Sequence, residues 1–156
     1  MGRGHLNRAA ALAIVAILAA AAPAAAALRW RLVAGGPALA SSVATTTAYV
    51  ALARPAVREF AAQLPKPGIA KARSVDFARD ALVAVFGEFG CRDGLIDVRA
   101  VEQQGTLITV DLVEHTPKPA TVMCMAVYPT YRLLTVPKAT LSKPYPLRAK
   151  VTLARA

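Results

Sequence analysis

The stretch LIDVRAVEQQGTLITVDLVE, residues 95–114, decides the fold of this chain. Apolar residues alternate with polar ones in both halves, so each half would place its apolar side chains on one face of an extended strand. The apolar positions are Ile96, Val98 and Ala100 in the first half, and Ile108, Val110 and Leu112 in the second. Gln103-Gln104-Gly105 joins the halves as a short link ending in glycine. This pattern predicts an antiparallel β-hairpin.

Further short strands are predicted on both sides of the hairpin. The continuous apolar run ALVAVF, residues 81–86, predicts a strand that is buried on both faces. Other runs that favour strands are residues 45–52, 121–128 and 131–136, and residues 147–153 form a last edge strand. Short strands with turn residues between them predict a mainly β (α+β) fold, either an antiparallel β-sandwich or a partly open barrel.

One short helix is predicted near the beginning of this β-rich domain. Pro55 suits the first turn of a helix and Pro65 ends the segment, while the apolar residues between them recur at helical spacing. We therefore expect a helix over residues 55–64, with an isolated turn as the alternative. Residues 66–73, which contain a proline and a glycine, read as a basic linker.

The N-terminal segment has the pattern of a signal peptide. Two arginines precede an apolar run from Ala9 to Ala27 that ends in four alanines. A basic start, an apolar stretch and small residues at its end predict cleavage after Ala26 or Ala27. The alternative is an uncleaved membrane anchor, because the run is long enough to span a bilayer. We expect an exported protein, periplasmic or secreted, that touches a membrane only if the leader is retained.

The sequence thus divides into three parts. Residues 1–27 are the predicted signal peptide, residues 28–43 a flexible lead-in with two glycines and two serines, and residues 44–156 a single β-rich domain. Export would place Cys91 and Cys124 in an oxidising compartment, where a disulfide bond is the default state of two cysteines. We therefore predict a structural Cys91–Cys124 bridge.

No motif in the chain points to a conventional enzyme. No serine lies in a Gly-x-Ser-x-Gly turn, and no glycine loop carries the lysine of a phosphate-binding motif. His115, next to Glu114 and close to Asp111, lacks the three or four spaced ligands of a typical metal site. We expect no catalytic residues, no metal and no cofactor.

The 156 residues carry a formal net charge of +10, with 56% hydrophobic and 18% charged residues. The high hydrophobic fraction excludes a disordered chain. The basic residues are scattered and not interleaved with aromatic ones, so we expect no nucleic-acid partner. The one candidate basic cluster surrounds the predicted helix and consists of Arg54, Arg58, Lys66, Lys71 and Arg73. A solvated face is the simplest interpretation of this cluster, and an anionic envelope polymer or lipid surface is the alternative ligand.

The order of short motifs resembles the PrcB-type protease-complex-subunit domain over about residues 49–138. The shared features are Ser74-Val75-Asp76-Phe77, the apolar strand that ends at Gly87, a glycine-rich loop, a hairpin, and a late Tyr128-Pro129 followed by Val136-Pro137. The resemblance implies an exported β-rich domain that stabilises or accompanies a protease complex without being a hydrolase. Where that family has Thr-Gly-Gly-Tyr, this chain has Gly90-Cys91-Arg92-Asp93-Gly94 and lacks the tyrosine. This loop is also similar to loops of chagasin-like protease inhibitors.

The sequence therefore predicts an exported, non-catalytic interaction domain whose partner is another envelope or secreted protein, with a protease as one candidate. Loops held on a rigid sheet are common binding sites. The candidate partner-binding loops are residues 87–94 and 116–119, with Glu88, Phe89, Arg92, Asp93 and Lys118 as the candidate contact residues. A basic module for the envelope surface and a protease-inhibitor-like domain are the alternative functions.

Overall fold

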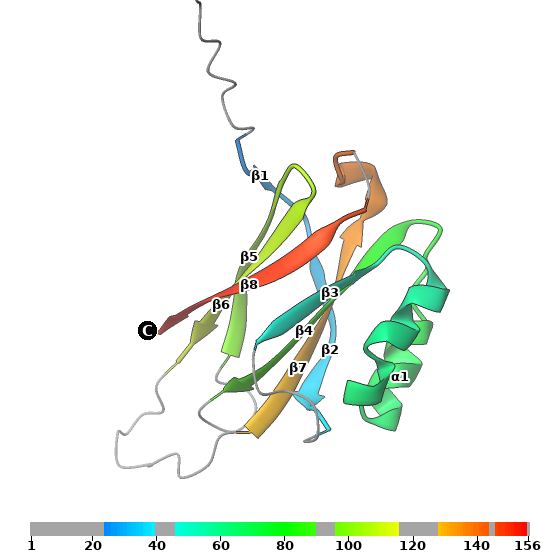
Figure 1. Ribbon diagram of the computed structural model, residues 1–156, viewed down its shortest axis with the longest axis vertical. Helices are drawn as coiled ribbons and strands as arrows, with labels where there is room; N and C mark the ends of the chain where they lie inside the picture. Colours follow the sequence, from blue (N-terminus) through cyan, green and yellow to red (C-terminus); the bar gives the residue numbers. More distant parts are fainter. Residues whose placement is uncertain (1–23, 40–45, 90–95, 116–127, 144–145, 156) are drawn as a thin grey trace, which may run out of the picture.

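In a computed structural model of the chain, two four-stranded sheets face each other. The structure describes residues 24–39, 46–89, 96–115, 128–143 and 146–155. The first sheet has the order β1 (Ala26–Ala27), β5 (Ile96–Gln104), β6 (Leu107–Glu114) and β8 (Arg148–Arg155). The second has the order β2 (Arg31–Pro37), β7 (Tyr128–Pro137), β4 (Asp80–Phe89) and β3 (Thr47–Ala51). The predicted mainly β fold of two sheets is confirmed, and the sheets do not close into a barrel (Figure 1).

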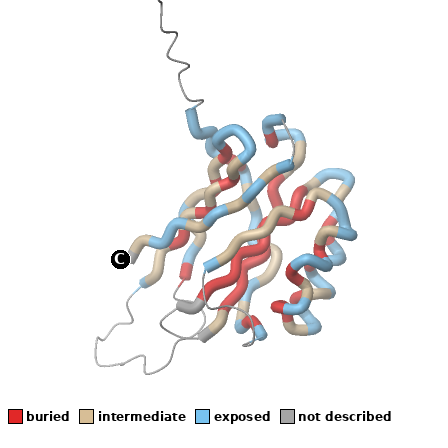
Figure 2. Tube along the Cα trace, viewed as in Figure 1, coloured by how far each residue is buried: buried red, intermediate tan, exposed pale blue. Residues whose placement is uncertain are grey.

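Two apolar clusters hold three layers together. One cluster lies between the sheets and contains alternate residues of β4 and β7 together with Val101, Ile108, Val110 and Leu112 of the first sheet. The other lies between the second sheet and the helical segment, and contains the intervening residues of β4 with Val57, Phe60 and Leu64. Residues 81–87 are therefore buried on both faces, which confirms the prediction for this strand (Figure 2). Apolar layers on both sides explain why β4 shows no alternation in its sequence.

The central hairpin forms as predicted, with one local shift. Strands β5 and β6 pair antiparallel, and Gly105 has a φ of 57° in the connecting turn, a conformation that favours glycine. The register shifts between Val98 and Ala100, so that an extra residue lies on β5. This bulge moves the inward-facing positions from Ala100 to Val101 and Gln103, both of which are buried.

The helical segment differs from the prediction. Residues 55–64 form two 3-10 helices, η1 (Arg54–Glu59) and η2 (Ala61–Gln63), in place of one α-helix. The α-helix α1 (Lys66–Arg73) lies instead in the predicted linker. Pro67 is compatible with α1, because it lies in the first turn, where a missing N–H costs nothing, but Pro55 lies in the first turn of η1 in the same way. Of the four apolar residues at helical spacing, Val57, Phe60 and Leu64 are buried and Ala61 is half-buried.

The predicted flexible lead-in contains a strand. Arg31–Pro37 forms β2, which pairs antiparallel with β7. Immediately before it, Ala26–Ala27 pairs with β5 as β1, and the Leu28 N–H donates to Val101 O at 2.8 Å. Both alanines belong to the predicted signal peptide, so the predicted cleavage after Ala27 would remove β1 and leave Leu28 on the sheet. The chain thus passes from the edge of the first sheet to the edge of the second (Figure 1). Edge position explains the missed strand, because all seven of its residues are exposed or half-buried and leave no apolar alternation to detect.

The last strand is an edge strand, as predicted, but it runs parallel to its neighbour. The register of β8 on β6 begins at Leu107↔Arg148, and the Arg148 N–H donates to Thr106 O at 2.8 Å. A short 3-10 helix, η3 (Lys138–Thr140), starts the connection from β7 to β8. The predicted strand 121–128 lies outside the described residues except for Tyr128, which begins β7. Within the described residues, no helix is long and apolar enough to cross a bilayer.

Candidate partner-binding end

The two predicted partner-binding loops start and finish at one end of the sandwich. Residues 90–95 connect β4 to β5, and residues 116–127 follow His115 and lead into β7. In the second sheet Phe89 is paired with Tyr128, and in the first sheet Ile96 is paired with Glu114. All four strand ends therefore lie together (Figure 1), and we call this region the loop-bearing end.

The candidate contact residues divide between described and undescribed parts of the chain. The prediction of a loop over residues 87–94 is wrong in its first part, because β4 extends to Phe89. The backbones of Glu88 and Phe89 form the last two positions of this strand, opposite Pro129 and Tyr128. Arg92, Asp93 and Lys118 lie outside the described residues. Cys91 and Cys124 lie outside them as well, so the predicted disulfide stays a prediction.

A buried arginine connects the two sheets near the loop-bearing end. Arg132 on β7 is only 7% exposed. Its Nη1 donates to the backbone oxygen of Tyr131 at 3.0 Å, and its Nη2 donates to Ile96 O, the first residue of β5, at 3.2 Å. Hydrogen bonds that involve a charged donor are stronger than neutral ones, so this contact fixes the start of β5 against the second sheet.

A hollow of about 410 Å³ opens beside this arginine. Its wall consists of Leu32, Gly35, Gly36 and Pro37 of β2, Ile96 and Asp97 of β5, and Arg132. Among the described strands β2 is an edge strand, with β7 on one side only, and Leu32 is 51% exposed. The sequence did not point to this site. The one available signal was the Gly35-Gly36 pair, because glycine within a strand often marks the close approach of another group.

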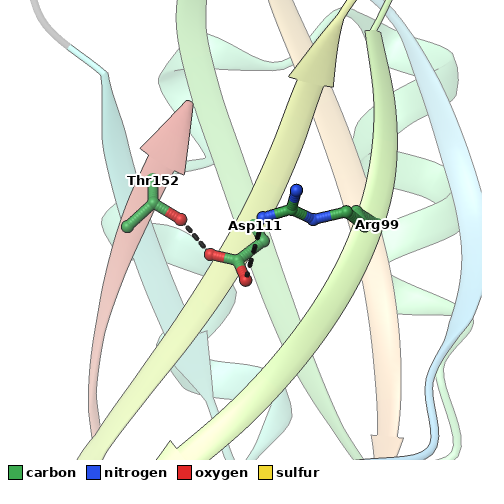
Figure 3. A network of polar contacts seen from close by, with 3 residues as sticks. All are labelled: Arg99, Asp111 and Thr152. Carbon is green, nitrogen blue, oxygen red and sulfur yellow. Dashed lines mark hydrogen bonds and ion pairs between the residues drawn. The ribbon is translucent and has the colours of Figure 1, made fainter. Parts of the chain in front are cut away.

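An exposed ion pair lies on the rim of the same end. His115 Nε2 is 3.0 Å from Asp97 Oδ2, and both side chains are largely exposed. His115 therefore contacts a residue across the hairpin and does not converge with Asp111, which lies elsewhere on β6. Asp111 contacts Arg99, at 3.9 Å, and the hydroxyl of Thr152 (Figure 3). Among the described residues, no group of three or more histidine, cysteine or carboxylate side chains could hold a metal ion.

The predicted basic cluster lies on the helical layer, away from both sheets' inner faces. Arg54, Arg58, Lys66, Lys71 and Arg73 are all exposed. None of them forms an ion pair with a carboxylate of the described residues. The five side chains therefore face solvent, which suits either of the two interpretations given to them from the sequence.

Comparison with known proteins adds no family to these observations. No protein-family model matches the chain, and neither a curated protein nor a solved structure shows significant similarity to it. The resemblance to the PrcB-type domain stays a prediction.

Proposed function

We propose that this chain is an exported, non-catalytic interaction domain that binds its partner protein at the loop-bearing end. The observation that carries the proposal is the pairing of Phe89 with Tyr128 and of Ile96 with Glu114. These pairs join the bases of two loops that the sequence had singled out separately. Two connections that share one base can form a single contact surface.

The base of this surface is held rigidly, as a binding site requires. Arg132 fixes the start of β5 to the second sheet through Ile96 O. Next to it, the hollow and the edge of β2, which no other described strand covers, offer a partner backbone both space and hydrogen-bonding groups. The loop-bearing end thus combines strands that Arg132 holds in place with an exposed hollow and strand edge that a partner can contact.

The class of partner follows from the sequence resemblance. A PrcB-type domain accompanies a protease complex, so an envelope protease or one of its subunits is the partner that we propose. A protease-inhibitor-like role is the alternative at the same end. The two differ in outcome, because an inhibitor lowers the rate of peptide hydrolysis by the captured protease and an accompanying subunit does not.

Site-directed photo-crosslinking in the native host tests this proposal. A photoreactive amino acid at Asp97, whose side chain is 71% exposed at the loop-bearing end, should yield a crosslinked partner. The same amino acid at Thr152, exposed on β8 of the first sheet, serves as the matched control and should yield none. The Phe89→Ala substitution should weaken the Asp97 crosslink. Equal crosslinking from both positions, or none from Asp97, would overturn the proposal.

The exposed basic surface of the helical layer supports a second candidate function, binding to an anionic envelope surface. Attraction of this kind is screened by salt. Vesicles that contain phosphatidylglycerol should then retain the protein at low salt and release it at moderate salt. Replacing Arg58 and Lys71 by glutamate should abolish this retention without changing the Asp97 crosslink, which separates the two functions.

A further inference from the structure

The Arg29-Trp30-Arg31 segment forms one wall of a second hollow, at the opposite end of the second sheet. Trp30 is half-buried and packs against the cluster between the sheets, and the neighbouring Leu28 is buried. These two residues anchor the segment to the core. Arg29 and Arg31 are exposed and line the hollow. Arg31 is the partner of Thr135 on β7, which lies in the same hollow and is only 4% exposed.

A third arginine reaches this hollow from a turn that is held in place. The Arg79 N–H donates to Asp76 O at 3.1 Å, and the Ala78 N–H donates to the Asp76 carboxylate at 3.0 Å. Lys138, just after β7, fixes the turn from outside: its N–H donates to Arg79 O at 2.9 Å, and its Nζ donates to Phe77 O at 2.5 Å. The backbone that carries Arg79 is therefore positioned before any ligand binds.

The hollow has a volume of about 410 Å³. Its lining residues are Arg29, Trp30, Arg31, Asp76, Arg79, Asp80, Thr135 and Pro137. None of its three arginines lies within 4.0 Å of a carboxylate in the part of the chain that the structure describes. Their guanidinium groups are thus available to a ligand, and the volume falls within the range of about 300–1,000 Å³ that small-molecule sites occupy.

The residue types define the ligand chemistry. Guanidinium groups present paired N–H donors that match the oxygens of a phosphate. Asp76 and Asp80 would repel a bare anion, but carboxylate oxygens accept hydrogen bonds from hydroxyl groups. A ligand that carries a phosphate and adjacent hydroxyls satisfies both sets of residues, whereas inorganic phosphate satisfies only one.

We propose that this hollow binds a phosphorylated polyol of the glycerol phosphate type, with Arg29, Arg31 and Arg79 on the phosphate and Asp80 on a hydroxyl. The source of this group is either a free metabolite or the headgroup of a lipid, since both present the same chemistry. The site is independent of the partner surface, because Asp80 and Phe89 are opposite ends of β4.

Titration calorimetry on the exported protein tests the proposal. We expect glycerol 3-phosphate to bind about tenfold more tightly than inorganic phosphate, and glycerol not to bind, since each added charge-assisted hydrogen bond strengthens binding. Arg79→Gln should weaken glycerol phosphate binding by about tenfold or more. The matched control is Arg148→Gln, which removes the same charge from an exposed position on β8 and should leave the affinity unchanged.

Asp80→Asn separates the proposed ligand from a simple anion, because it should raise the affinity for inorganic phosphate and lower the preference for glycerol phosphate. Phosphatidylcholine vesicles with and without phosphatidylglycerol identify the source of the glycerol phosphate group. Vesicle binding that requires both phosphatidylglycerol and Arg79 indicates a lipid headgroup. Binding of soluble glycerol 3-phosphate without vesicle binding indicates a metabolite. The proposal is overturned if Arg79→Gln and Arg148→Gln weaken binding equally, or if inorganic phosphate binds as tightly as glycerol phosphate.

Discussion

Gly35 and Arg132 are paired across β2 and β7 so closely that a Cβ on Gly35 would lie 2.8 Å from Arg132 Cδ. The arginine side chain occupies the space that any other residue at position 35 would need. The missing side chain thus allows a buried arginine to run beside β2 and reach Ile96 O. The start of β5, and with it the loop-bearing end, depends on this fit.

The first prediction follows from that distance. Gly35→Ala should lower the free energy of unfolding by about 1–3 kcal/mol, because the added methyl group meets a buried side chain that has little room to move. Urea denaturation followed by circular dichroism measures the change.

A double-mutant cycle identifies the cause of that loss. If crowding against the arginine is responsible, Gly35→Ala should cost less in an Arg132→Met background than in the parent chain. Gly105→Ala is the control for glycine strain alone, because Gly105 has a positive φ and no atom within 4 Å of its added Cβ. The interpretation fails if the cost of Gly35→Ala is the same in both backgrounds.

The second prediction concerns Phe60, which attaches the helical segment to the second sheet. Its side chain is only 1% exposed, and its ring centroid lies 5.6 Å from that of Tyr49 and 6.0 Å from that of Phe86. Phe60→Ala should cost about 3–5 kcal/mol through lost burial and the cavity that remains. Thermal unfolding measures the loss. Phe77→Ala, at a half-buried position against the same cluster, should cost clearly less, and an equal loss would contradict this assignment.

The elements that the sequence predicted correctly are those whose pattern is written in consecutive residues. The apolar run 81–86 predicted the buried strand β4, and the alternation within residues 96–112 predicted β5 and β6. Each pattern shows which residues of its own strand are buried. The bulge at position 99 could not be predicted in this way, because nothing in the neighbouring sequence indicates it. It moves the later residues of β5 to the opposite face of the sheet. The alternation alone would have placed Ala100 inward.

The missed features depend on partners distant in the sequence. Strand β2 exists because β7 pairs with it, and β7 is about a hundred residues further along the chain. The position of the α-helix was also missed, because Pro55 and Pro67 are equally compatible with a helix start and packing decides which one begins an α-helix. Neither hollow could be predicted, because each combines β2 or its approach with residues of other strands or turns.

The third prediction concerns Gln103, a buried amide that connects the hairpin to the chain before β8. Its Nε2 donates to Gly105 O at 2.7 Å and to Ser142 O at 2.8 Å, and its Oε1 accepts from the Ser142 N–H at 2.9 Å. Gln103→Ala should lower the free energy of unfolding by about 2–3 kcal/mol, because it removes three hydrogen bonds that are each worth about 1 kcal/mol. Chemical denaturation tests this, with Thr106→Ala at an exposed position of the same turn as a near-neutral control.

Gln103→Glu adds a pH dependence to the same test. An ionised carboxylate would face two carbonyl oxygens, so the pKa of the introduced acid should be raised above its unfolded value. A raised pKa means that the folded state binds the proton more tightly, so the variant should be most stable at low pH and lose stability as the pH rises through the folded pKa. Stability that increases with pH over this range, relative to the parent chain, would contradict the predicted contacts.

The fourth prediction is the Cys91–Cys124 bridge. Cys91 follows Phe89 by two residues, Cys124 precedes Tyr128 by four, and Phe89 and Tyr128 are paired between β4 and β7. Neighbouring strands lie about 4.8 Å apart, which is close to the Cα separation of about 5.5 Å in disulfides. Since each residue can span up to about 3.5 Å, chain length does not prevent the two cysteines from meeting. We expect thiol titration of the unreduced, denatured protein to find no free thiol, and two free thiols would rule out the bridge.

The bridge should also be visible in the stability of the domain. It would close a loop of about 34 residues, and the chain-entropy relation assigns about 3–4 kcal/mol to such a loop. The Cys91→Ser/Cys124→Ser variant should therefore unfold at a lower denaturant concentration than the oxidised parent chain. The parent chain under reducing conditions is the control, because it lacks the bridge but keeps both side chains, and it should match the double variant closely. If the double variant instead matches the oxidised parent chain, the bridge contributes nothing to the base of the loop-bearing end, and the paired strands β4 and β7 alone hold the two loops together.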